Sequence, residues 1–342
     1  MNTTHHEISK FCAELGKDRL LVQGAGGNVS WKEDGVLWIK GSGTWLANAD
    51  RENIFVPVNF NNLKEALLSE NFYISPPVLG KHKLRPSIET ILHALMPQRI
   101  VVHLHEIYSL SHLVIRGCQI TLEHFFKQSK INSVFVGYRK PGPELAREVF
   151  KALIIEPCAN VVLLQNHGIV IGANDIGEVH ALIKSIRNIC SPKYQKSVIT
   201  FSTYPQISPK VQGYLAFNDT QVHELACNPS LYKRLQSDWT LYPDHIVFLG
   251  PKAFTYSSWA DFLENNLGCL PELIFIENIG VFVTADFNLA KSTQLVCYYD
   301  VVSRIAPKAQ LNPLASEAIY ELLNWDAEWH RKKMSSYRST TN

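Results

Sequence analysis

The sequence has almost no excess of charge of either sign. Its 342 residues include 33 Lys and Arg against 31 Asp and Glu, which gives a formal net charge of +2 at pH 7. A protein that binds nucleic acid or an anionic membrane needs a concentrated basic excess. Neither partner is therefore expected, and any charged ligand must be bound by local groups.

The sequence also lacks paired cysteines and long uninterrupted apolar runs. The seven cysteines are odd in number, scattered, and never spaced as C-x-x-C, which argues against a disulfide framework and a thiolate zinc site. We expect free thiols in a reducing compartment. No basic segment followed by an apolar one opens the chain, so we expect no signal peptide, no membrane span and a cytoplasmic location.

Nucleotide-binding fingerprints are missing as well. The segments 24–30 and 40–44 combine glycines with small hydroxyl or amide side chains, and their backbone N–H groups could hold an anion such as phosphate. Neither segment has the spacing of a P-loop or of the G-x-G-x-x-G dinucleotide motif. ATP and NAD are therefore disfavoured, and a phosphate site without a nucleotide is the better interpretation.

The length and composition predict two domains. Hydrophobic residues make up 46% of the chain and charged residues 19%, which suffices for ordinary buried cores. A Ser- and Pro-punctuated stretch at 191–209 is the expected linker. We predict a catalytic domain over 1–195 and a C-terminal α/β domain over 205–342.

The two domains share a repeated pattern. Residues 161–171 and 273–283 both read as a strand, an Asn-x-Gly turn and a second strand, so the C-terminal domain is expected to be a degenerate partial repeat. The first copy carries His167 at the turn and the second carries Ile279. The second copy is therefore expected to bind no metal and to serve packing or assembly.

Hydrophobic periodicity indicates the main elements of the first domain. Helices are expected over 8–15, 86–95, 176–189 and a segment that opens at 140–144, with a further helix and a variable loop within 60–85. Strands are expected over 36–40, 54–58, 99–105 and 160–165. Residues 24–30 are expected to form a glycine-rich turn.

Three histidines form the predicted metal site. His103 and His105 alternate on the expected strand, so both imidazoles point to the same face. His167 lies in an Asn-His-Gly turn, where the glycine allows the backbone to bend and the ring to face inward. Three neutral imidazoles with an open fourth position suit a catalytic zinc ion, although a His-x-His pair by itself is also compatible with packing in the core.

A glutamate lies at the start of the helix expected over 86–95. There Glu89 could serve as a proton-transfer group next to the positive end of the helix dipole. From its position alone, a solvated glutamate at the helix start is the favoured interpretation. His93, four residues later, is interpreted as its partner or as a packing residue.

Together these motifs resemble the class II aldolase/adducin family. The resemblance rests on five ordered segments: Gly27-Asn28-Val29-Ser30, Lys40-Gly41-Ser42-Gly43, Arg85-Pro86-Ser87 with Glu89, His103-Leu104-His105, and Asn166-His167-Gly168. Further segments, including Asp244-His245-Ile246-Val247-Phe248 and residues 323–328, resemble the aldolase portion of bifunctional rhamnulose-phosphate aldolase/alcohol dehydrogenases.

The resemblance implies a fold and residue roles. The fold would be a three-layer α/β/α sandwich around a mainly antiparallel sheet, followed by the smaller, partly duplicated domain. His103, His105 and His167 match the zinc ligands, and Glu89 matches the acid/base. Asn28, Ser42, Gly43 and Ser87 match the positions that hold the substrate phosphate. Lys40 departs from the family, whose short aldolases usually have an uncharged residue there, and its charge either strengthens that anion site or indicates a different substrate. The proton-donating tyrosine of some aldolases has two candidates here, Tyr108 and Tyr138.

These features predict a zinc-dependent lyase. It would cleave or form a carbon–carbon bond in a ketose phosphate through a metal-stabilised enediolate, and another divalent transition metal could replace zinc. The resemblance further implies a homo-oligomer, with a tetramer favoured. A sugar-phosphate dehydratase or epimerase remains an alternative, because the same intermediates lead to those products. A non-catalytic adducin-like assembly protein is the second alternative.

Overall fold

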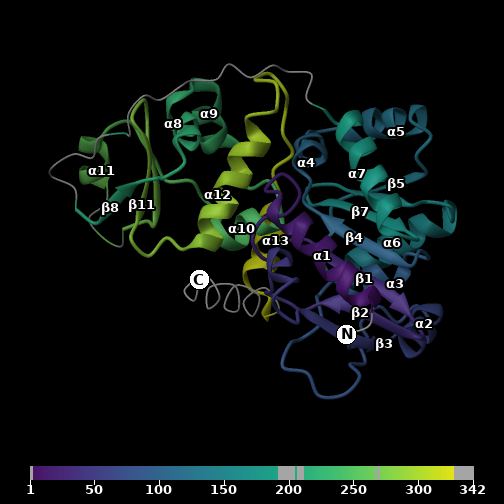
Figure 1. The fold of residues 1–342 in the computed structure, drawn as a ribbon. Coiled ribbons are helices and arrows are strands. Elements are labelled where there is room, and N and C mark those ends of the chain that lie inside the picture. The colour runs from purple at the N-terminus through teal and green to yellow at the C-terminus, as the bar shows by residue number, and fades with distance from the viewer. Residues whose placement is uncertain (1–2, 192–204, 206–211, 266–267, 269, 327–342) are drawn as a thin grey trace.

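The computed structural model describes residues 3–191, 205, 212–265, 268 and 270–326. The chain forms a larger α/β part and a smaller one, each built on its own sheet (Figure 1). The boundary expected between 195 and 205 lies outside the described residues, as do most of the expected linker and the last residues of the 323–328 segment. Across the described part of the chain, no helix is long and apolar enough to span a bilayer.

A seven-stranded sheet organises the larger part. Its strand order is β3-β2-β1-β4-β7-β6-β5, and every neighbouring pair is antiparallel except β5 with β6. The strands are β1 (Asn28–Glu33), β2 (Val36–Lys40), β3 (Phe55–Asn59), β4 (Ile100–Leu104), β5 (Ser133–Val136), β6 (Val161–Leu164) and β7 (Gly168–Ala173).

Helices cover both faces of this sheet. The helices are α1 (Thr3–Lys17), α2 (Phe60–Leu68), α3 (Thr90–Leu95), α4 (Ile107–Leu113), α5 (Cys118–Gln128), α6 (Pro143–Ile155) and α7 (Ile176–Ile189), with a 3₁₀ turn at Leu46–Asn48. Because strand residues alternate between faces, Val102 packs with α1, α5 and α7, whereas Val101 packs with α3 and α6. The expected three-layer sandwich with a mainly antiparallel sheet is confirmed.

The smaller part repeats half of that sheet. Its order is β8-β11-β10-β9, in which only β9 and β10 are parallel, as in the series β4-β7-β6-β5. The two Asn-x-Gly turns also match, because Asn166 has φ 53° and Asn278 has φ 57°. The expected partial duplication is therefore present in the fold.

The elements of the smaller part complete the description. Its strands are β8 (Tyr214–Ala216), β9 (Thr255–Tyr256), β10 (Leu273–Ile276) and β11 (Gly280–Thr284). Its helices are α8 (Glu224–Cys227), α9 (Pro229–Ser237), α10 (Pro243–Leu249), α11 (Trp259–Asn265), α12 (Leu289–Val302) and α13 (Ser316–Leu323), with a 3₁₀ turn at Thr220–His223.

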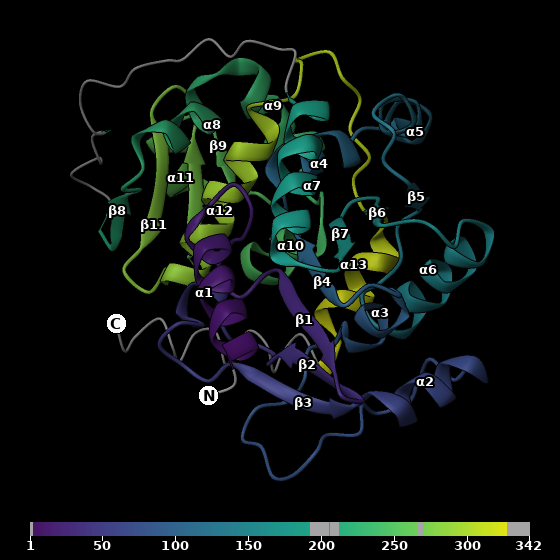
Figure 2. The same ribbon diagram turned by 45° about the vertical axis from the view of Figure 1, so that its right-hand side comes forward.

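Helix α4 joins the two cores. Its Leu113 packs in the core of the large sheet, whereas Ile107 and Leu110 pack with residues of the smaller part. Helix α12 of the smaller part lies beside α4 (Figure 2). An ion pair joins Arg19 to the buried Asp300 across the same boundary, with Nε and Oδ2 3.3 Å apart.

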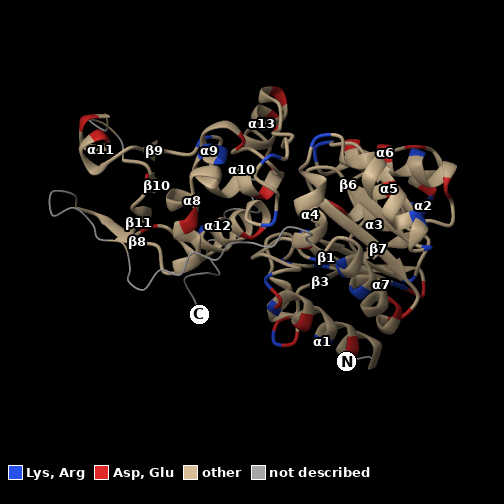
Figure 3. Cartoon of the chain, turned by 90° about the horizontal axis from the view of Figure 1, so that it is seen from above, with Lys and Arg blue, Asp and Glu red and all other residues tan. Residues whose placement is uncertain are grey.

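Positively and negatively charged residues are interspersed along the chain in both parts (Figure 3), in keeping with the near-zero net charge. Six of the seven cysteines lie in the described residues, and all six are free, as expected for a chain without a disulfide framework.

Several sequence-based boundaries were wrong. Residues 28–30 are the start of strand β1 rather than part of a turn, because Asn28 pairs with His103 and Ser30 with Val101 in the middle of the sheet. The expected helix over 86–95 begins only at Thr90. Strand β4 ends at Leu104, so His105 lies just beyond it, and elements α4, α5 and β5 were not predicted.

Candidate active site

Three histidine side chains converge where β4 ends beside the turn that leads into β7. The ligand atoms of His103, His105 and His167 all lie within 4.8 Å of one another, and all three residues are buried. The Nε2 atoms of His103 and His105 are 3.2 Å apart. Glycine is required after His167, because a Cβ on Gly168 would lie 2.4 Å from the carbonyl oxygen of Leu104.

The partners of His103 and His105 determine which nitrogens face the centre. Nδ1 of His103 lies 3.0 Å from the carbonyl oxygen of Ile169, and Nδ1 of His105 lies 3.5 Å from a carboxylate oxygen of Asp244. Each Nδ1 faces an acceptor, so we assign it the proton. The two Nε2 lone pairs then face each other at 3.2 Å, an arrangement that a cation between them would stabilise.

The third histidine completes the donor set. Burial, followed by the charge of His103, lowers the pKa of His167 to about 3. Its imidazole is therefore neutral at physiological pH, which is the form that binds a metal. Three neutral imidazoles suit zinc and other divalent transition metals, so the residues present fit the expected ion.

Glu89 lies against the same centre. Its Oε1 is 3.5 Å from Nε2 of His103 and 3.4 Å from Nε2 of His167, and the side chain is buried. The other oxygen, Oε2, accepts a hydrogen bond of 2.5 Å from Nδ2 of Asn28. Glu89 is the N-cap residue of the short helix α3, so its position depends on Asn28 and the histidines rather than on a long helix dipole.

The opposite wall of the pocket carries hydroxyl groups and a buried cation. Nζ of Lys40 donates to the carbonyl oxygens of Ala25 (2.9 Å) and Thr44 (2.8 Å), and the lysine is 1% exposed. Ser42 and Ser87 are buried nearby, and Oγ of Ser87 accepts from the backbone N–H of Glu89. This wall offers the donors that an anionic group of a ligand requires.

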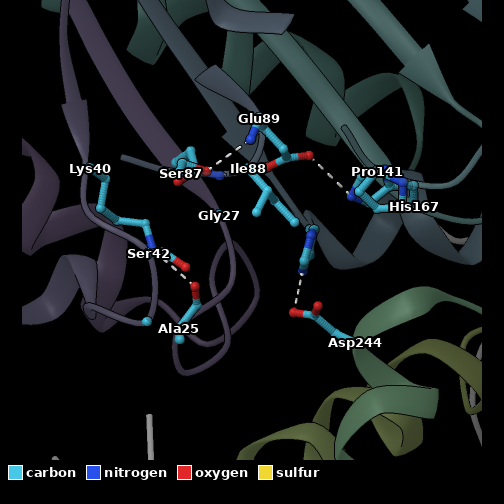
Figure 4. Close-up of a pocket in the computed structure, with 13 residues that line it drawn as sticks. Ala25, Gly27, Lys40, Ser42, Ser87, Ile88, Glu89, Pro141, His167 and Asp244 are labelled. Carbon is cyan, nitrogen blue, oxygen red and sulfur yellow. Dashed lines mark hydrogen bonds and ion pairs between the residues drawn. The ribbon is translucent and has the colours of Figure 1, made fainter. Parts of the chain in front are cut away.

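One pocket gathers almost all of the residues singled out from the sequence (Figure 4). Asn28, Lys40, Ser42, Gly43, Ser87, Glu89, His105 and His167 line it. His103 contacts Glu89 from β4. His93 stands apart and is fully buried, with its Nδ1 2.8 Å from Oγ of Ser30, which is the packing role offered as one interpretation.

The pocket also contains a residue that the sequence did not reveal as functional. Asp244, in the first turn of α10, lines the pocket from the smaller part (Figure 4), and its Oδ2 lies 3.5 Å from Nδ1 of His105. The C-terminal part therefore contributes a side chain to the pocket, which the expectation of a role in packing or assembly did not include. The segment 244–248 supported the family resemblance, but nothing in its spacing placed the aspartate beside the histidines.

The second copy of the turn has a different environment. Nδ1 of the buried His223 accepts from the backbone N–H of Val281, and its Nε2 lies 3.0 Å from the carbonyl oxygen of Phe217. Both ring nitrogens of His223 therefore contact backbone groups, those of Val281 and Phe217. Among the described residues, His103, His105 and His167 are the only group of three or more His, Cys, Asp or Glu side chains placed to hold a metal ion. Neither Tyr108 nor Tyr138 lines the pocket.

The sequence matches the profile of a known protein family. Residues 6–193 match the family profile described as class II aldolase and adducin N-terminal domain. YuxG of Bacillus subtilis, described as an uncharacterized oxidoreductase, is 30% identical over 173 residues, which is 46% of this chain and 24% of that protein. The matched region is therefore about a quarter of the length of this curated relative.

Two solved structures are similar to the chain at a low level. The N-terminal class II aldolase domain of a conserved protein from Thermoplasma acidophilum has 24% identity and a TM-score of 0.47, covering 56% of this chain and 93% of that one. An L-fuculose 1-phosphate aldolase has 19% identity and a TM-score of 0.42, covering 56% and 84%.

Proposed function

This chain belongs to the class II aldolase and adducin family, and from that membership we propose that it is a zinc-dependent lyase acting on a ketose phosphate or a similar hydroxy-ketone. The observation that carries the proposal is the convergence of the Nε2 atoms of His103 and His167 on Oε1 of Glu89. A fold used only for assembly, as in the adducin-like alternative, has no need of this arrangement.

In this proposal His103, His105 and His167 hold the divalent ion. When bound, the ion would supply electrostatic stabilisation for the negative charge of an enediolate. Zinc is the ion we propose, with another divalent transition metal as the alternative. The proposed metal site is preformed, because Ile169 orients the imidazole of His103 and Asp244 orients that of His105.

Glu89 is proposed to move the proton at the carbon that gains or loses the bond. Asn28 holds one carboxylate oxygen, which leaves the other directed at the centre formed by the histidines. Water is largely excluded, since Glu89 is 5% exposed. A fixed carboxylate in such a place can shuttle a proton without reorganising.

The phosphate of the substrate is proposed to bind at the opposite wall. Asn28, Ser42, Gly43 and Ser87 line the pocket, and Lys40 supplies the positive charge. Because two carbonyl oxygens already fix the ammonium group, little side-chain entropy is lost when an anion arrives. A phosphorylated sugar fits this combination of donors and charge.

The remaining properties follow from family membership and composition. We propose a cytoplasmic homo-oligomer, with a tetramer favoured, that binds neither nucleic acid nor membrane. The domain division at 1–195 and 205–342 is part of the same proposal. A dehydratase or epimerase would use the same groups, so the products of the reaction distinguish these activities from a lyase.

A panel of sugar phosphates with product analysis tests the proposal. A lyase splits the substrate into two smaller carbon compounds, an epimerase converts it into a stereoisomer, and a dehydratase removes water from it. On the substrate so found, Glu89→Gln should lower turnover by about 10²–10⁴-fold. Oε1 of Glu89 lies close to Nε2 of His103 and of His167, so the substitution can also alter metal binding. The metal content of each sample is therefore measured together with its turnover.

Glu224→Gln is the matched control for that experiment. Glu224 is also a buried glutamate, but it lies in α8 of the smaller part and does not line the pocket. Its turnover should equal that of the wild type. Normal turnover in a folded Glu89→Gln protein would remove Glu89 from the mechanism, and a protein that bound no divalent metal would contradict the proposed function as a whole.

A further inference from the structure

Asp244 reaches the histidine cluster from a different part of the fold. It follows Pro243, the first residue of helix α10, and it is 3% exposed. Its Oδ2 lies 3.5 Å from Nδ1 of His105. The larger part supplies all three histidines and Glu89, so this carboxylate is the contribution of the smaller part to the pocket.

The carboxylate is held in place from its own side. Nε2 of Gln294, on helix α12, lies 3.4 Å from Oδ2 of Asp244 and 3.4 Å from the carbonyl oxygen of Gln23. Gln294 is 2% exposed. One amide thus links the aspartate to the backbone of the larger part, just before the glycine-rich segment.

The glycine-rich segment leaves room for this approach. A Cβ on Gly26 would lie 3.0 Å from Oδ2 of Asp244, from Nδ1 of His105 and from the carbonyl oxygen of Gln23. Such a distance is tighter than most real Cβ contacts. A side chain at this position would therefore press on both partners, and glycine permits the aspartate and the imidazole to face each other directly.

The contact has a chemical consequence for His105. An imidazole that binds a metal through Nε2 must carry its proton on Nδ1, and a carboxylate facing Nδ1 stabilises that tautomer and fixes the ring. His103 has the carbonyl oxygen of Ile169 in the same role. Asp244 thus faces Nδ1 of His105 as the carbonyl oxygen of Ile169 faces Nδ1 of His103.

We propose that Asp244 is a positioning residue of the metal centre, through which the smaller part of the chain sets the affinity of the site for a divalent cation. The inference rests on the proposed function, because it requires that the three histidines bind a metal. It assigns to the C-terminal part a role beyond packing, since the larger part alone would lack the carboxylate that orients His105.

The test is a metal-affinity measurement on the full chain. The protein is stripped of metal and titrated with zinc in competition with a chromophoric chelator. Asp244→Asn keeps the size of the side chain and removes its charge, so we expect affinity to fall by about 10- to 100-fold. Gly26→Ala, which presses on both partners from the other side, is a second route to the same loss.

Asp300→Asn is the matched control. Asp300 is also a buried aspartate of the smaller part that faces the larger one, but its partners are Arg19 of the larger part and Arg304 of its own part rather than a histidine. Its loss should leave zinc affinity unchanged. A fall in affinity shared by Asp300→Asn would mean that Asp244 acts only through docking of the two parts, and would overturn the proposal.

A second readout reports on the ring itself. Long-range ¹H–¹⁵N spectra of metal-free protein distinguish the two imidazole tautomers, and His105 should carry its proton on Nδ1 in the wild type but lose that preference in Asp244→Asn. Unchanged affinity and an unchanged tautomer in Asp244→Asn would refute the inference while leaving the metal site intact. Absence of zinc binding by the wild type would instead refute the proposed function.

Discussion

Replacing Asn166 by alanine should destabilise the protein and loosen the turn that carries His167. The amide Nδ2 of Asn166 donates to the carbonyl oxygens of Leu241 (2.7 Å) and Asn312 (2.8 Å), and its Oδ1 accepts from Nδ2 of Asn312 at 3.0 Å. All three bonds cross from the larger part to the smaller one. Asn166 itself is fully buried.

The magnitude has two components. Alanine at a φ of 53° costs about 1 kcal/mol relative to asparagine, because both residues crowd the backbone with Cβ in the left-handed region but only asparagine has a short polar side chain that makes this conformation tolerable. Losing the side chain removes three hydrogen bonds and leaves buried polar groups of Leu241 and Asn312 without their partner, which costs about 1–3 kcal/mol for each unsatisfied group when water cannot reach it. Since two of these bonds are only partly buried, we expect a total loss of about 3–5 kcal/mol.

The duplicated turn provides the control. Asn278 has nearly the same backbone conformation, with φ 57°, but its side chain is exposed and has no hydrogen-bond partner among the described residues. Asn278→Ala therefore carries the backbone cost alone. The difference between the two variants should be about 2–4 kcal/mol, which is the contribution of the bonds between the two parts.

Chemical denaturation of the metal-free chain measures this difference, and zinc titration of the same samples measures its effect on the site. Asn166→Ala should also bind zinc more weakly, because the turn that positions His167 loses its anchor, whereas Asn278→Ala should bind normally. Equal losses of unfolding free energy in the two variants, within about 0.5 kcal/mol, would show that the bonds from Asn166 do not couple the two parts.

Two further predictions concern histidines. His103→Ala and His167→Ala should each lose the bound divalent ion on elemental analysis, because each removes one of three ligands; full occupancy in both would contradict the site. His245 is fully buried with no hydrogen-bond partner at either ring nitrogen among the described residues, and burial lowers its pKa to about 3. Below its ordinary pKa of about 6.5 the unfolded chain takes up a proton that the folded chain does not, so stability falls as the pH falls toward 3. Between pH 7 and pH 5 the free energy of unfolding of the wild type should fall by about 2 kcal/mol more than that of His245→Phe in denaturant titrations. Equal falls in the two proteins would show that His245 does not stay neutral in the folded chain.

Local spacing was enough to identify much of this site. His103 and His105 are separated by one strand residue, and the Asn-His-Gly turn requires a glycine whatever surrounds it, since a Cβ there would strike the carbonyl of Leu104. Helix α7 has the predicted bounds because Asp175 caps it and its apolar residues recur at helical spacing. The repeated turn could be found because the same backbone conformation needs the same residue types.

Other features depended on contacts between distant segments. Strand β1 was not recognised, because a glycine-rich segment becomes a strand only when β2 and β4 pair with it on both sides. Glu89 is placed by Asn28 and the histidines rather than by its helix. Asp244 lies in a helix with an ordinary first turn, and only the docking of that helix beside Gly26 brings its carboxylate to His105. Sequence determines which groups can do chemistry, whereas packing determines which of them meet, because the contact between Asp244 and His105 depends on how two cores fit together and has no local spacing to reveal it.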